Sequence, residues 1–108
     1  MRLSKPWLAS DDALSLLHGN LGVFQLGDAA GDVLYIGVAS GLSKFGLKGA
    51  VSEALATHSG AVFVRYEITT SYHTRYRELL MLHKADFGEL PVGNSDASGV
   101  TLGQLSPG

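Results

Sequence analysis

The sequence predicts one small α+β domain (α/β in the broad sense), in which a three-stranded antiparallel or mixed sheet is flanked by helices. Short runs rich in β-branched and aromatic residues alternate with segments of helical periodicity, and Gly, Asp, Ser and Pro mark the boundaries between them. The chain has 108 residues, 45% of them hydrophobic, which is enough for the modest core of a single domain. The expected order is helix, strand, strand, helix, strand, helix.

A short first helix is expected to begin next to Ser10, whose side chain can cap it. Asp11 and Asp12 follow, and their carboxylates suit the positive end of the helix dipole. Gly19 is expected to end this helix. We assign residues 1–20 to an N-terminal helical extension of the domain.

A β-hairpin is expected after this extension. Residues 21–27 and 33–38 both favour extended structure, and the second run begins with Val, Leu, Tyr and Ile. The segment between them, residues 28–32, contains two Asp and one Gly and has the composition of a tight turn. Two strands joined by such a segment predict an antiparallel pair.

A helix, a strand and a last helix complete the domain. The apolar positions of the first of these helices share one helical face: Leu47, Ala50, Val51, Ala54 and Leu55. Residues 62–69 alternate between apolar and mixed side chains, which is the two-residue period of a strand. The last helix is expected over residues 72–87, ended by Gly88. The domain then covers residues 21–94, and residues 95–108 form a C-terminal tail.

Charge and composition restrict the function classes. The net charge is −2, so bulk charge does not indicate a nucleic-acid-binding protein, although most Lys and Arg lie between residues 40 and 84. The chain has no cysteine, which removes disulfides, thiolate metal sites and cysteine nucleophiles together. No apolar run approaches the roughly 20 residues that a membrane span needs. We expect a cytoplasmic protein with no membrane partner.

Two tripeptides in the expected hairpin point to a family. Residues 22–24 read Gly-Val-Phe, and residues 35–37 read Tyr-Ile-Gly. They resemble the signature of the GIY-YIG nuclease superfamily, with the second tripeptide intact and with Val and Phe replacing Ile and Tyr in the first. The family continues with a helix, a strand, a helix that carries a glutamate, and commonly an asparagine. Glu78 and Asn94 stand in that order here, so the resemblance covers about residues 21–94.

The resemblance implies a metal-dependent endonuclease that hydrolyses phosphodiester bonds in DNA. Glu78 would hold a single Mg²⁺ or Mn²⁺, because carboxylate oxygen suits such ions. Tyr35 and Asn94 would belong to the catalytic set, with Tyr35 positioning or activating the attacking water. Lys44 and Lys48 lie near the place of the family's phosphate-binding arginine and would meet phosphate as point charges. The expected partner is nucleic acid, DNA ahead of RNA.

Departures from the family pattern leave a second interpretation open. Phe24 lacks the hydroxyl of the first tyrosine, and no arginine stands near the start of the middle helix. In this second interpretation the chain has a catalytically degenerate GIY-YIG fold and serves as a nucleic-acid or protein interaction module. It would act alone, as a homodimer or with a protein partner. Tyr35 would be an ordinary strand residue, and Glu78 a solvated helix residue. In a third interpretation the domain is unrelated and the tripeptides are coincidence.

Histidines and a further tyrosine are secondary candidates. His58 and His73 suit proton transfer or phosphate contact. His83 falls on the apolar side of the last helix and is expected to be structural. Tyr76 is expected in the core. None of these residues has the spacing of a zinc site.

Overall fold

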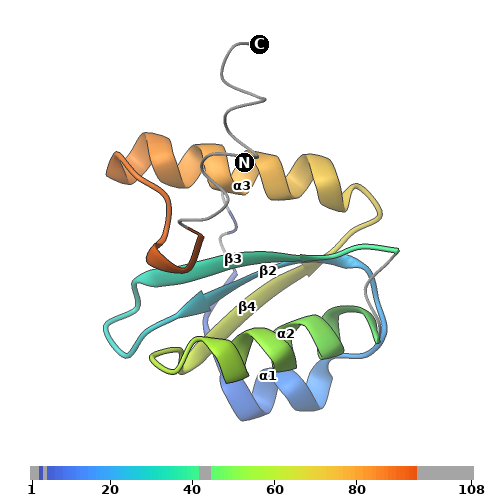
Figure 1. Ribbon diagram of the computed structural model, residues 1–108. Helices are drawn as coiled ribbons and strands as arrows, with labels where there is room; N and C mark the ends of the chain where they lie inside the picture. Colours follow the sequence, from blue (N-terminus) through green and yellow to red (C-terminus); the bar gives the residue numbers. More distant parts are fainter. Residues whose placement is uncertain (1–2, 4, 42–44, 95–108) are drawn as a thin grey trace.

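The computed structural model describes residues 3, 5–41 and 45–94. In this part of the chain a four-stranded sheet lies between helices, with α3 on one face and α1 and α2 on the other (Figure 1). The elements in chain order are β1 (Leu8–Ala9), α1 (Ser10–Leu16), β2 (Gly22–Gly27), β3 (Val33–Ala39), α2 (Gly46–Thr57), β4 (Phe63–Ile68), α3 (Tyr72–Phe87) and the short 3-10 helix η1 (Val92–Asn94). The predicted α+β class and the order of its predicted elements are confirmed.

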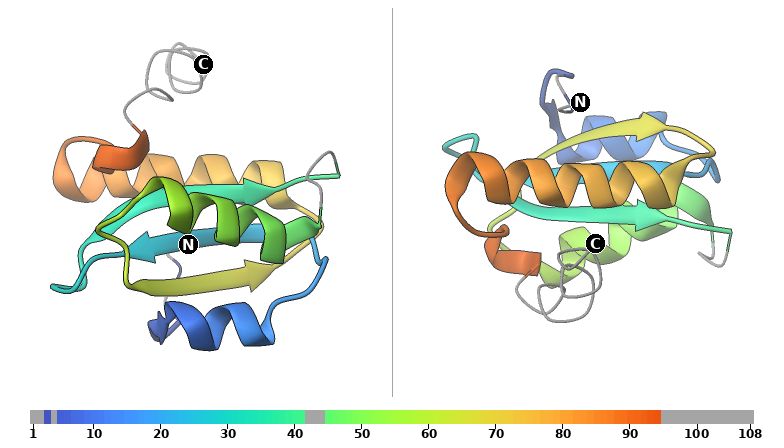
Figure 2. Two further views of the ribbon diagram at one scale, coloured as in Figure 1. Left: turned by 60° about the horizontal axis from the view of Figure 1, so that its bottom comes forward. Right: turned by 90° about the horizontal axis from the view of Figure 1, so that it is seen from above.

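The sheet has one strand more than predicted. Its order is β1-β4-β2-β3, and every neighbouring pair is antiparallel. β1 joins the sheet by pairing Leu8 with Val64 of β4, and the segment that follows buries Ala13 and Leu17 in the same core as Phe24. β1 and α1 therefore pack together with the hairpin as parts of one domain (Figure 2). A two-residue strand is too short to leave a periodic pattern in the sequence.

The predicted hairpin joins β2 to β3. Its turn is held by the Asp28 side chain, whose Oδ1 accepts the N–H groups of Ala30 and Asp32 at 3.0 and 2.9 Å. Gly31 adopts a φ of 87°, a backbone conformation that glycine takes at little cost. β2 then lies in the centre of the sheet, and β3 forms its outer edge.

The sheet face toward α1 and α2 forms an apolar core. Phe24, Leu26 and Val64 of the strands are fully buried there against Leu47 of α2. A Cβ on Gly37 would lie 2.2 Å from Cζ of Phe24, so this glycine leaves the space that the Phe24 ring fills. The second tripeptide therefore keeps its glycine for a packing reason.

The helix ends predicted from the sequence agree with the structure for α3 but not for the start of α1. α3 ends at Gly88, which has a φ of 81°, and this prediction is confirmed. The prediction that Ser10 caps α1 is wrong, because Ser10 is the first residue of that helix and no side chain caps it. The N–H of Ser10 instead donates to the carbonyl of Val62 at 3.1 Å, since β1 continues directly into α1.

Candidate functional site

Tyr35 lies on β3, on the face covered by α2. Its half-buried ring stacks on His58, directly after α2, with 4.5 Å between ring centroids, and its centroid lies 5.9 Å from that of Phe24. Burial raises the pKa of the Tyr35 phenol above its ordinary value, and the carboxylate of Glu53 raises it further. The phenol is therefore protonated at neutral pH and suited to donate a hydrogen bond.

Asn94 holds the outer edge of β3. Its Nδ2 donates to the carbonyl of Ile36 at 2.8 Å, and its Oδ1 accepts the N–H of Ile36 at 2.7 Å. The side chain thus makes the pair of hydrogen bonds that a neighbouring antiparallel strand would make. Asn94 is 3% exposed, so this pairing is shielded from water. The predicted catalytic asparagine is engaged in closing the sheet.

Tyr76 brings α3 to the same edge. Burial raises the pKa of its phenol, the nearby Tyr35 raises it further, and a hydrogen bond with Asn94 lowers it. A Cβ on Gly93 would lie 2.8 Å from Cε1 of His58, so η1 packs closely against this histidine. We call Tyr35, His58, Tyr76 and Asn94 the edge cluster. The cluster brings together β3, the C-terminal end of α2, α3 and η1.

Glu78 is held elsewhere. Its carboxylate accepts a hydrogen bond from the guanidinium of Arg75, and Nε of Arg75 donates to Oε2 of Glu67 on β4 at 2.9 Å. This network lies between α3 and the sheet face that α3 covers, whereas Tyr35 packs on the α2 face. The carboxylate that acts on Tyr35 is Glu53 of α2. The structure therefore does not bring Tyr35 and Glu78 together.

The surroundings of Glu78 do not favour the predicted Mg²⁺ or Mn²⁺. Its carboxylate is engaged by Arg75, whose guanidinium it shares with Glu67. Among the described residues, no three His, Cys, Asp or Glu side chains gather where they could hold a metal ion. Mg²⁺ binds octahedrally through carboxylates, phosphates and water, and Arg75 competes for the one carboxylate offered. The ion at Glu78 stays a prediction.

The predicted lysines do not join the edge cluster either. Lys44 lies outside the described residues. Lys48 is exposed in the first turn of α2, whereas His58 follows its last turn. At 1.5 Å of rise per residue, Lys48 and His58 are about 15 Å apart along the helix axis. Of the predicted site residues that the structure describes, only Tyr35 and Asn94 lie together.

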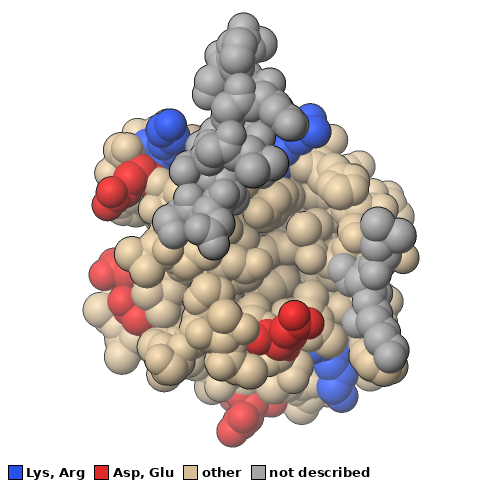
Figure 3. Space-filling model, in the orientation of Figure 1, with Lys and Arg blue, Asp and Glu red and all other residues tan. Residues whose placement is uncertain are grey.

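Two exposed cationic side chains and an exposed histidine lie on one side of α3. His73, Arg77 and Lys84 are all exposed, and their spacings of four and seven residues put them on the same side of the helix. In Figure 3, Lys and Arg side chains lie apart from one another at the top of the visible face, where Figure 1 places α3, and an acidic side chain lies beside the left-hand one. His73 is three residues before Tyr76, so this cationic side of α3 borders the edge cluster.

Sequence reasoning identifies only part of this arrangement. It singles out Tyr35, Asn94 and His58, but it predicts Tyr76 for the core and assigns nothing to Glu53. The helical spacing of Tyr76 with its apolar neighbours is a correct signal for a core-facing position. Only the placement of α3 along the outer strand brings its phenol near that of Tyr35.

Comparison with known proteins gives one match. A family model described as a domain of unknown function, DUF7508, matches residues 1–86, which includes β1 and α1 and nearly all of α3. No curated protein and no solved structure matches the chain significantly. Within the described residues, no helix combines the length and the apolar character needed to cross a membrane.

Proposed function

The chain belongs to DUF7508, a family of unknown function, and we propose that its domain is a catalytically degenerate GIY-YIG-like fold that binds nucleic acid. One arrangement carries this proposal. Of the side chains expected to take part in hydrolysis, Asn94 is bound to β3 and Glu78 to Arg75, while cationic side chains stand exposed on α3. Phosphate contact then occurs without hydrolysis.

Three features argue against hydrolysis. A general base must accept a proton near neutral pH, and the raised pKa of Tyr35 makes its phenol a weak candidate. Phe24 is 1% exposed and offers no hydroxyl in its place. Both polar atoms of the Asn94 side chain already pair with Ile36, and the Glu78 carboxylate is paired with Arg75.

The cationic side of α3 supplies the binding surface. Arg77 and Lys84 are exposed and lie about two helical turns apart, a spacing that lets both approach phosphates of one strand. His73 adds a hydrogen-bond donor. A surface of so few cations is expected to bind weakly, with a dissociation constant on the order of 10⁻⁴ to 10⁻⁶ M, and without sequence preference. DNA is the expected ligand ahead of RNA.

Fluorescence anisotropy with labelled DNA and RNA duplexes and single strands tests the binding. We expect Arg77→Glu to weaken binding to DNA by at least about fivefold and to reduce the slope of log affinity against log salt by about 1. Lys5→Glu is the matched control, since it reverses an exposed charge outside α3 and is expected to change little. Absence of binding at low salt, or equal losses in the two variants, would contradict the proposal.

A metal-dependent DNA endonuclease is the second candidate. It is favoured by the meeting of two phenols and an imidazole in the edge cluster, a set of groups that can position and protonate oxygens. Supercoiled plasmid incubated with the protein and Mg²⁺ or Mn²⁺ separates the two candidates. We expect no nicking above background. Nicking that is lost in both Glu78→Ala and Tyr35→Phe would favour the nuclease and end the degenerate interpretation.

We further propose a cytoplasmic location and a protein partner. A chain without cysteine suits a reducing compartment. Because the cationic side of α3 is small, a second copy of the chain or another protein would extend the phosphate-binding surface. Sedimentation of the protein with and without DNA measures whether a dimer forms on the nucleic acid.

A further inference from the structure

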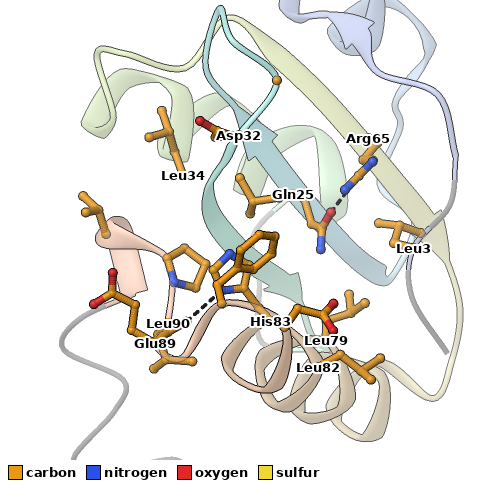
Figure 4. A pocket seen from close by; sticks show the side chains of 16 residues that line it. Leu3, Gln25, Asp32, Leu34, Arg65, Leu79, Leu82, His83, Glu89 and Leu90 are labelled. Atoms are coloured by element: carbon orange, nitrogen blue, oxygen red, sulfur yellow. Dashed lines mark hydrogen bonds between the residues drawn. The ribbon is translucent and has the colours of Figure 1, made fainter.

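A cleft of about 930 Å³ opens between the C-terminal half of α3 and the sheet (Figure 4). Its walls are largely apolar and include Leu79 and Leu82 of α3, Leu34 of β3 and Leu90 after the helix. A volume of this size is typical of sites for small molecules. The cleft lies on the opposite side of α3 from His73, Arg77 and Lys84, so it is separate from the proposed phosphate-binding surface.

Two polar side chains stand in the wall formed by the sheet. Gln25 of β2 and Arg65 of β4 face each other in the strand register, and Nε of Arg65 donates to Oε1 of Gln25 at 2.7 Å. Figure 4 shows this pair across the cleft from Leu79 and His83. Gln25 is 5% exposed, and its Nε2 has no hydrogen-bond partner in the described part of the chain. An unpaired amide donor therefore lines the cleft.

Arg65 has no carboxylate partner in the described part of the chain. Trp7 covers one face of its guanidinium, with Cζ of Arg65 at 4.1 Å from the ring centroid. Burial lowers the pKa of Arg65, and no acidic neighbour offsets that effect. The guanidinium still carries its charge at neutral pH. Trp7 and Gln25 hold it in one orientation, and its two terminal nitrogens are left for another acceptor.

The mouth of the cleft carries charge of the opposite sign. Asp32 follows the hairpin turn, Asp86 lies in the last turn of α3 and Glu89 follows that helix, and all three are exposed residues of the lining. His83 fixes this part of the rim, because its Nδ1 donates to the carbonyl of Glu89 at 2.9 Å. An anionic group is therefore favoured beside Arg65 and disfavoured at the mouth.

We propose that this cleft is a binding site for a small monocarboxylate with an apolar body. The carboxylate accepts hydrogen bonds from the terminal nitrogens of Arg65 and from Nε2 of Gln25, a planar fork that matches its geometry. The apolar body packs along Leu79 and Leu82. Because of the acidic mouth, the site selects against a second carboxylate at the far end of the ligand.

Octanoate is a suitable probe, with octanedioate, octan-1-ol and octylammonium as matched ligands. Trp7 is the single tryptophan of the chain and contacts Arg65, so its fluorescence reports on the site. We expect octanoate to bind with a dissociation constant on the order of 1 mM or tighter, and the other three to bind at least about fivefold more weakly. In ¹H–¹⁵N NMR spectra of the unaltered protein, octanoate is expected to shift the side-chain amide signals of Gln25 and the indole signal of Trp7.

Variants give an independent test. Arg65→Met is expected to weaken octanoate binding at least about tenfold, and Gln25→Leu about threefold. Lys48→Met removes an exposed cation on α2, away from the cleft, and is expected to leave binding unchanged. If octan-1-ol binds as well as octanoate, or if the signals of Gln25 do not shift in the unaltered protein, the proposal fails. The NMR result holds even where a variant does not fold.

Discussion

The two faces of the sheet are built differently, although the same strands supply both. Toward α1 and α2, Phe24, Leu26 and Val64 form a fully buried apolar core, and the half-buried rings of Tyr35 and Tyr66 pack against it. Toward α3, the neighbouring positions include Gln25 and Arg65, which pair with each other beside an open cleft. The second face has its own buried apolar cluster around Val23, Ile36 and Leu80, and it adds charge and an open cleft to that cluster.

The two-residue period of a strand makes this separation possible. Successive residues of β2 and β4 point to opposite faces, so β2 supplies Phe24 and Leu26 to the α2 side. The alternate positions supply both the apolar Val23 and the polar Gln25 to the α3 side. A buried polar group is costly unless it is hydrogen-bonded, and each polar side chain under α3 makes at least one such bond, Arg65 with Gln25 and Arg75 with Glu67. Both faces therefore contain a buried apolar core, and the α3 face also has a cleft that can accommodate a ligand.

The largest expected effect comes from shortening one leucine on each face. Leu26 is 0% exposed in the filled core, and Leu79 is 2% exposed but lines the cleft. Leucine-to-alanine changes in cores cost about 2–5 kcal/mol of unfolding free energy, and we expect Leu26→Ala near the upper end and Leu79→Ala near the lower end. Chemical denaturation measures both. Equal losses would mean that the α3 face is packed as tightly as the other.

Removal of the Asn94 side chain is expected to have the next largest effect. Asn94→Ala leaves the N–H and the carbonyl of Ile36 without their partner, which costs about 1–3 kcal/mol of unfolding free energy. Hydrogen exchange of the Ile36 amide should accelerate in the same variant. Asn20→Ala, at an exposed position, is the control and should leave both measurements unchanged. An unaltered Ile36 exchange rate would show that the edge of β3 does not depend on Asn94.

A smaller effect is expected from the two phenols at alkaline pH. The pKa values of Tyr35 and Tyr76 are raised above the ordinary 10.0, so the unfolded state loses these protons first as the pH rises. Their contribution to stability is complete below pH 10.0 and is lost as the pH rises through the folded-state values. Denaturation curves across this range should show the loss.

The same pair offers a direct test of proximity. In Tyr35→Phe, the pKa of Tyr76 is expected to fall toward its ordinary value, because the charge of the neighbouring phenolate is gone. Ultraviolet or NMR titration of the phenols measures this change. A Tyr76 titration identical to that of the unaltered protein would place the two hydroxyls too far apart to interact.

Much of the fold follows from local patterns. The hairpin, the alternating strand at β4 and the end of α3 at Gly88 depend on residues near one another in the sequence, and these predictions are confirmed. The site is less predictable. Glu78 stands in the last helix, where the resemblance requires a glutamate. Its side chain pairs with Arg75 on the α3 side of the sheet, whereas Tyr35 packs on the α2 side. Which side of a helix faces which strand is a long-range property.

The sequence alone determined the type and order of the main elements, because hydrophobic periodicity and turn chemistry act over a few residues. Only the tertiary structure decided that β1 joins β4, that Asn94 closes the edge of β3, and that Gln25 meets Arg65. Those contacts join residues far apart in the chain, since they depend on strand register and on the placement of helices over the sheet. No local pattern encodes either one.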